Sequence, residues 1–160
     1  MVILDHGEVV YIDKIDAKQP TGGLVMSSRV GARNPAHSCA VGKVLLSHLP
    51  EEALENLTRE KGLPARTANT ITDPRRLREH LKTVRAQGYA VDDEENERGI
   101  RCLAAPILDG RGTAVAAISV SGPAVRVAKK TLQDVFRKEV VGAAAEISRR
   151  LGFSGRTGSE

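Results

Sequence analysis

The 160-residue sequence predicts one α+β domain with a largely antiparallel sheet. The predicted elements follow the order strands, helices, strands and a final helix, which is typical of that class. Glycine-containing turns join neighbouring strand-like segments in hairpin fashion. The length suits one hydrophobic core and is short for two.

The sequence predicts short strands in the N-terminal part of the chain. VILDHGEVVYIDKI has β-branched and apolar residues on both sides of a turn at residues 5–7, which indicates a hairpin. Residues 22–30, GGLVMSSRV, form another extended stretch. We expect a loop in the next segment, GARNPAH, because it is rich in residues that favour turns.

Three helices are predicted next. Ser38 is placed to cap a helix that runs to about His48. Pro50 begins the segment EEALENLTREKG, and Gly62 is a suitable end for it. The third helix has the capping residue Asp73 and ends at Gly88. It also has Pro74 in its first turn and an apolar stripe of Leu77, Leu81 and Val84.

The C-terminal half predicts three strands and a helix. The strands cover residues 89–92, 101–108 and 113–121, and the last two are joined by a turn at residues 109–112. After Gly122-Pro123, apolar residues at helical spacing continue to Leu151. We expect residues 153–160 to form a flexible polar tail.

Charge and composition argue against direct nucleic-acid binding by this chain. The net charge is +4, and after Pro123 there are 8 basic residues against 4 acidic ones. A single solvated helix commonly carries such charges, and stacking aromatics are scarce, with two Tyr, two Phe and no Trp. The chain has neither a membrane-length apolar run nor signal-peptide features, so we expect a cytoplasmic protein without membrane contact.

Small side chains should gather on one face of the predicted hairpin of residues 101–121. Alternation along the strands places Cys102, Ala104, Ala117, Ser119 and Ser121 together if the strands pair in register. Protein interiors are close-packed, so either a closely packed helix or a ligand must fill the space beside these residues. The sequence leaves both alternatives open.

The start of the helix near Ser38 strengthens the ligand alternative. Its segment HSCAVGK also consists mainly of small residues, and backbone amides at a helix start can bind an anion. A small carboxylate could bind the amides of Ala40 and Val41, with its remaining polar group toward the sheet. An ordinary helix start under a loop would use the same residues.

Several separated motifs resemble the effector-binding domain of the IclR family of bacterial transcription regulators. They are HxxxxGK, TxxTI, GYxxxDEE, GIxCxAxP and SVSGP, in that order. The resemblance implies a GAF-like domain at residues 1–152, with a curved antiparallel sheet flanked by helices and assembly into homodimers or homotetramers. It also implies a winged helix-turn-helix domain that binds DNA, which we expect to be absent from this chain.

The resemblance also implies a pocket for a small organic acid. Carried over position by position, that pocket consists of Met26, Ala40, Val41, Asp92, Cys102, Ser119 and Ser121. Ala40 and Val41 depart from the smaller glycine and alanine of some members, and their added methyl groups narrow the site. The expected function is effector sensing that controls DNA binding, without enzymatic activity, a cofactor or a metal.

Other kinds of site use some of the same residues. Cys102 could serve a GAF-like thiol-dependent redox enzyme, with Cys39 as the other sulfur. The two cysteines form no CxxC motif, and His37, His48, His80 and Cys39 have no regular zinc-ligand spacing. We expect Glu94, Glu95 and Glu97 to lie in a solvated turn rather than to bind a cation. A pure oligomerisation module, using the amphipathic last helix, is the remaining alternative.

Overall fold

A computed structural model describes residues 1–16 and 28–155 of the chain. Its sheet has six strands in the order β3-β2-β1-β6-β5-β4, and the pairings between them are antiparallel. The strands are β1 Val2–Asp5, β2 Glu8–Tyr11, β3 Arg33–Pro35, β4 Ala90–Asp93, β5 Ile100–Leu108 and β6 Ala114–Pro123. The helices are α1 Ala40–Leu46, α2 Glu51–Lys61, α3 Pro74–Gln87, α4 Lys129–Thr131, the π-helix η1 Leu132–Phe136, and α5 Arg137–Arg150. The predicted α+β class and the curved, helix-flanked antiparallel sheet are confirmed.

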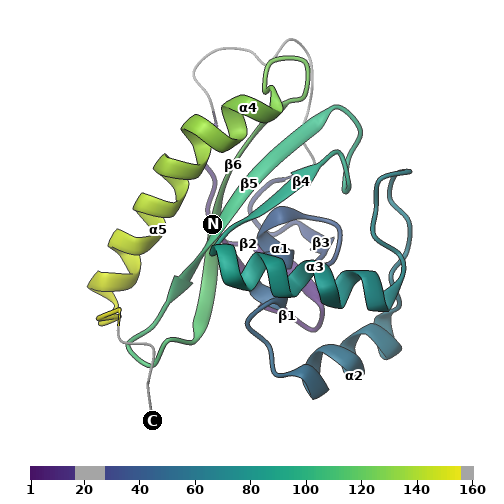
Figure 1. The fold of residues 1–160 in the computed structure, drawn as a ribbon, viewed down its shortest axis with the longest axis horizontal. Helices are drawn as coiled ribbons and strands as arrows, with labels where there is room; N and C mark the ends of the chain where they lie inside the picture. The colour runs from purple at the N-terminus through teal and green to yellow at the C-terminus, as the bar shows by residue number, and fades with distance from the viewer. Residues whose placement is uncertain (17–27, 156–160) are drawn as a thin grey trace.

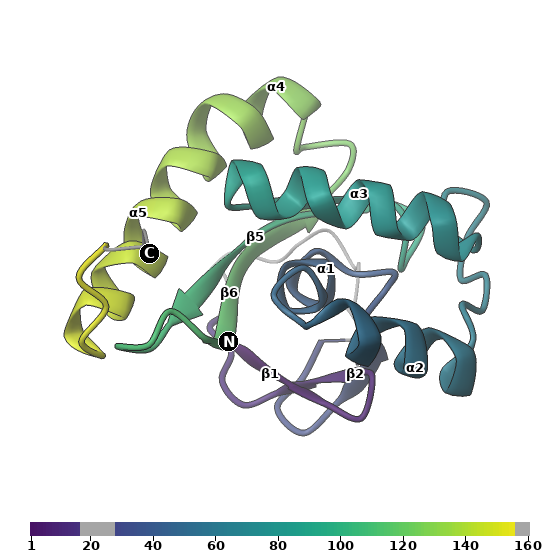
Figure 2. The same cartoon turned by 60° about the horizontal axis from the view of Figure 1, so that its bottom comes forward.

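Helices cover both faces of the sheet. Figure 1 shows α5 along one face of β5 and β6, while α1, α2 and α3 gather on the other side. Figure 2 shows α1 inside the curve of the sheet, between the β5–β6 pair and the β1–β2 hairpin. A separate cluster of buried apolar residues lies on each face, and the larger one surrounds α1.

The β5–β6 pairing sorts side chains as the alternation predicts. Cys102 pairs with Ser121 and Ala104 with Ser119, which puts the small residues on the face toward α1. Leu103 and Ala105 point the other way and belong to the cluster under α5. The predicted patch of short side chains therefore exists.

The outer edge of β4 is protected by side chains. The Lys43 ammonium donates to the Val91 carbonyl at 2.7 Å, and the Asn69 amide donates to the Asp93 carbonyl at 3.0 Å. An open strand edge would invite pairing with another chain, so these two donors shield it.

The predictions for α2 and α3 are confirmed. The Asp73 carboxylate accepts a hydrogen bond from the Arg76 amide at 2.8 Å, and Gly88 ends α3 with a left-handed φ of 77°. The second helix begins directly after Pro50 and ends at Gly62, whose φ is 68°. Both helix ends are determined locally, which explains why the sequence predicts them.

Two predictions near α1 are wrong. Cys39, not Ser38, is the residue before the first helical turn, because the Ser38 hydroxyl donates to Asn96 Oδ1 at 2.9 Å. Residues 33–35, expected in a loop, form β3 and pair with β2. Within the extended stretch predicted at 22–30, residues 22–27 lie outside the described part of the chain.

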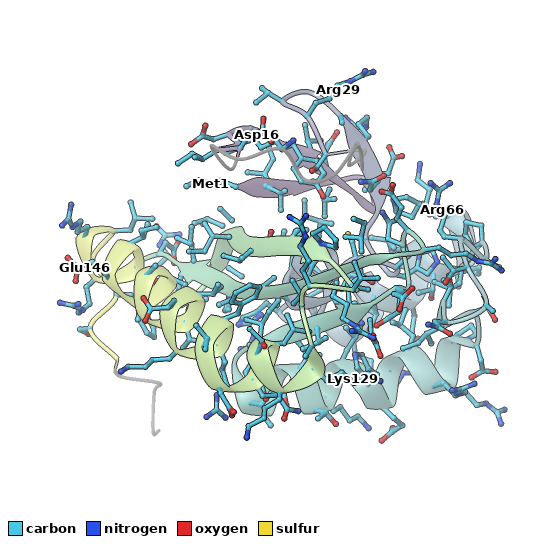
Figure 3. The ribbon with its side chains drawn as sticks, turned by 90° about the horizontal axis from the view of Figure 1, so that it is seen from above. Met1, Asp16, Arg29, Arg66, Lys129 and Glu146 are labelled. Carbon is cyan, nitrogen blue, oxygen red and sulfur yellow. The ribbon has the colours of Figure 1, made fainter. Side chains whose placement is uncertain are left out.

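The last helical segment is confirmed and includes the apolar residues from Leu132 to Ile147 that predict it. It begins at Lys129, and the π-helical turn η1 precedes the regular helix α5. Its basic side chains are exposed, and Arg149 and Arg150 both pair with Glu146 on the same helix. Figure 3 shows Lys129 and Glu146 at opposite ends of this segment, with Glu146 turned outward. Across residues 1–16 and 28–155, no helix has the length and apolar character needed to cross a membrane.

The packing of α1 at Gly42 gives a test of the fold. A β-carbon at Gly42 would overlap the backbone of Ala36, whereas one at the helical Gly142 would meet open space. We expect Gly42→Ala to lower the free energy of unfolding by about 3 kcal/mol or more, because backbone cannot yield cheaply. Gly142→Ala should raise it by about 0.5–1 kcal/mol. Equal stabilities of the two variants in urea denaturation would contradict this packing.

Candidate functional site

A narrow cavity lies between α1 and the small-residue face of β5 and β6. It is lined by Tyr11, Ser28, Cys39, Ala40, Val41, Asp92, Asn96, Glu97, Ile100, Cys102, Ser119 and Ser121. Six of the seven residues expected to form the pocket are among them, and Met26 lies outside the described residues. That these residues bind an effector stays a prediction.

The cavity is small in this conformation. The cavity measures about 400 Å³ when space open to solvent is included. Only about 20 Å³ of it is wide enough to hold the centre of a water molecule. That is close to the room needed by one water molecule. An organic acid therefore requires the lining side chains to move apart.

A larger cavity of about 350 Å³ lies on the opposite face, between α5 and β5. Ala105, Val141, Ala144 and Phe153 contribute to its largely apolar lining. Binding sites usually combine apolar walls with a few convergent polar groups. The narrow cavity has such groups, so it is the stronger candidate despite its size.

Asp92 is the acid at the centre of the narrow cavity. It is the last residue but one of β4 and is only 2% exposed, and its Oδ1 accepts hydrogen bonds from the amides of Glu95 at 2.6 Å and Asn96 at 3.3 Å. Burial raises the pKa of Asp92 to about 7, although these amide hydrogen bonds oppose the shift. The carboxyl group can therefore gain or lose a proton near neutral pH.

The turn after β4 is not the solvated turn that the sequence indicates. Glu95 is 8% exposed, and its Oε1 lies 2.5 Å from the ammonium of Lys43, which is fully buried. Glu97 is half-buried and is among the residues that line the cavity. The expectation is thus wrong for Glu95, because a lysine 52 residues earlier in the chain supplies its counter-charge.

Threonine hydroxyls fix the position of this turn. Thr70 Oγ1 donates to the Glu95 carbonyl at 2.7 Å, and Thr67 Oγ1 donates to the Glu94 carbonyl at 2.7 Å. Glu94 itself adopts a positive φ of 60°, a conformation that costs energy for a non-glycine residue. The turn is held in place by contacts from a separate loop and is therefore pre-organised.

Both cysteines remain thiols. Burial raises the pKa of Cys39 to about 12, and burial together with the negative charge of Asp92 raises the pKa of Cys102 above its ordinary value. The thiolate is the reactive form of cysteine, and these surroundings suppress it. The geometry therefore argues against a thiol-dependent enzyme.

The histidines do not converge on a metal site in the part of the chain that the structure describes. His37 Nε2 lies 3.0 Å from the Pro64 carbonyl, and His48 Nδ1 lies 3.0 Å from the Val44 carbonyl. Within residues 1–16 and 28–155, no three His, Cys, Asp or Glu side chains are grouped as metal ligands would be.

Comparison with known proteins shows the family. Residues 1–149 match the sequence model for the C-terminal domain of bacterial transcriptional regulator IclR. The chain belongs to the IclR family. The curated relatives that it matches are named as transcriptional regulators, among them a transcriptional repressor of Escherichia coli (strain K12).

Individual relatives agree in sequence and structure. The HTH-type transcriptional regulator KdgR of Escherichia coli (strain K12) is 38% identical over 150 residues, which cover 94% of this chain and 56% of KdgR. The crystal structure of Thermotoga maritima IclR has a TM-score of 0.86 and 39% identity, over 95% of this chain and 60% of that one. The chain spans about half the length of the curated relatives it matches.

A second similar structure contains a ligand. It is a double mutant of the inducer-binding domain of the PobR transcription factor from Acinetobacter, in complex with 3-hydroxybenzoic acid. It has a TM-score of 0.78 and 33% identity, over 92% of this chain and 85% of that domain.

Because Lys43 and Glu95 form a buried ion pair, we expect a single substitution in this pair to lower the free energy of unfolding much more than the double substitution does. Lys43→Met leaves a buried carboxylate without its partner and should cost about 3–5 kcal/mol of unfolding free energy. Adding Glu95→Gln should recover most of that loss, because the uncompensated charge is gone. The exposed pair of Lys82 and Glu79, 2.9 Å apart, is the control. Lys82→Met should cost less than about 1 kcal/mol.

Denaturant unfolding of the three variants measures these differences. If Lys43→Met lowers the free energy of unfolding no more than Lys82→Met does, the ion pair does not hold the turn.

Proposed function

We propose that the chain senses a small organic acid and thereby controls DNA binding by a winged helix-turn-helix domain of the same protein. The observation that carries this proposal is the convergence of Asp92, Cys102, Ser119 and Ser121 on one cavity beside the start of α1. These side chains come from three strands, β4, β5 and β6.

The donors around the cavity suit a carboxylate with one further polar group. Ser119 and Ser121 present hydroxyls from β6, and Ala40 and Val41 line the cavity from the first turn of α1. Amides in a first helical turn have no acceptor within the helix, so they can donate to a ligand oxygen. With only seven residues in α1, these amides act as separate hydrogen-bond donors rather than through a large helix dipole.

The relatives support an acid as the ligand class. The similar inducer-binding domain of PobR is in complex with 3-hydroxybenzoic acid, which is a carboxylic acid. The cavity of this chain is narrow, and the methyl groups of Ala40 and Val41 face it, so we favour shorter acids such as pyruvate.

Control of DNA binding needs two states that differ in effector affinity. An acid that separates α1 from the sheet would favour the state with the wider cavity, and the free energy of coupling equals the difference in its affinity for the two states. In a homodimer or homotetramer, which we also propose, such a change would alter the spacing of the attached DNA-binding domains in the cytoplasm.

The test is a ligand screen followed by a double substitution. We expect pyruvate or another acid from a panel with lactate, glyoxylate and 3-hydroxybenzoate to raise the Tm, since only a ligand of the folded state does so. Ser119→Ala with Ser121→Ala should weaken that binding by about 1–3 kcal/mol with little loss of fold. Isothermal titration calorimetry measures the affinity.

Exposed Ser154→Ala, outside the narrow cavity, is the control and should bind as the unaltered chain does. Unchanged affinity in the double variant would place the ligand elsewhere.

A further inference from the structure

The charges around the narrow cavity oppose an anion. Among the described residues that line it, Asp92 and Glu97 are acidic and none is Lys, Arg or His. The buried cation nearby, Lys43, already lies 2.5 Å from Glu95. Charges interact strongly where water is excluded, so a carboxylate ligand beside the ionised, buried Asp92 would bind poorly.

The geometry of Asp92 offers a way to remove one of these charges. Its Oδ1 accepts the amides of Glu95 and Asn96, and the side chain is almost inaccessible to water. A protonated carboxyl group can keep accepting at one oxygen while its O–H donates from the other. Protonation would therefore preserve the turn and create a donor for a ligand oxygen.

We propose that a monocarboxylate enters this cavity together with one proton, which Asp92 takes from solvent and uses to donate a hydrogen bond to the ligand. This inference rests on the proposed function and deepens it by naming the ligand class. The site accepts singly charged acids and disfavours doubly charged ones, because one proton balances only one added charge.

The groups around Asp92 make it the natural place for this proton. Those that face it are Tyr11 on β2, Cys39 just before α1, Lys43 on α1, Glu95 and Glu97 in the turn, and Cys102 on β5. Burial raises the pKa of the tyrosine and of both thiols, so these three groups are uncharged at neutral pH. The pKa of Asp92, raised by burial to about 7, means that taking up a proton costs little there.

The Kd of the ligand should depend on pH, because binding requires a proton on Asp92. Below about pH 6 Asp92 already holds its proton, so the Kd should be constant. Above about pH 7 a growing fraction of the chain must first bind a proton, and the Kd should rise toward tenfold per pH unit. Between pH 6 and pH 8 we expect an increase of about tenfold.

Calorimetry of the 160-residue chain with pyruvate measures the proton directly. Titrations in phosphate and in Tris, whose ionisation enthalpies differ, give the number of protons bound per ligand. We expect about one proton at pH 8 and nearly none at pH 6. Malonate, which is doubly charged at pH 8, should bind at least about tenfold more weakly than pyruvate.

Two aspartates adjacent in sequence supply matched variants. Asp92→Asn should bind pyruvate with a Kd independent of pH and without proton uptake. Asp93→Asn should keep both properties of the unaltered chain, because Asp93 faces away from the cavity and pairs with Arg101 and Lys129, each at 2.6 Å. Glu97→Gln should also keep the proton uptake. If this variant takes up no proton, the assignment of the proton to Asp92 is wrong.

The outcomes separate this inference from the function on which it rests. If pyruvate binds the unaltered chain with a constant Kd and no proton uptake, the inference is wrong and acid sensing stands. If none of pyruvate, lactate, glyoxylate and 3-hydroxybenzoate binds between pH 5 and pH 9, both the inference and the proposed acid sensing are wrong. The measurement on the unaltered chain decides this even if Asp92→Asn does not fold.

Discussion

The contact between Lys43 and Glu95 determines how the two halves of the candidate site meet. Its atoms lie 2.5 Å apart in the interior, and the same ammonium group donates to the Val91 carbonyl of β4. A buried ion pair contributes little net stability, because both ions lose their hydration, but removing one partner is costly. The pair therefore fixes α1 against the turn after β4 in one relative position.

The position of that turn decides where the acid of the cavity lies. Glu95 holds Lys43 with its side chain and donates its backbone amide to Asp92. Asn96 donates its amide to Asp92 and accepts the hydroxyl of Ser38 with its side chain. Because one short turn serves both α1 and β4, any widening of the cavity must either preserve these contacts or break several at once.

Local rules in the sequence predict much of this architecture. Strand alternation alone sorts Cys102 and Ser119 from Leu103, and the ends of α3 follow from Asp73 and Gly88. The misplaced cap at Ser38 has a different origin: the partner that its hydroxyl binds lies 58 residues away in sequence. Local rules do not predict the pair of Lys43 and Glu95 for the same reason, although a lone lysine inside the apolar run VGKVLL is a signal that its charge needs a partner.

A crystal structure of the chain with a bound acid tests the central claim most directly. We expect ligand density between α1 and β6, with one carboxylate oxygen near Asp92, the polar end near Ser119 and Ser121, and the contact of Lys43 with Glu95 intact. Density in the apolar cavity between α5 and β5 instead, with the narrow cavity closed, would contradict it.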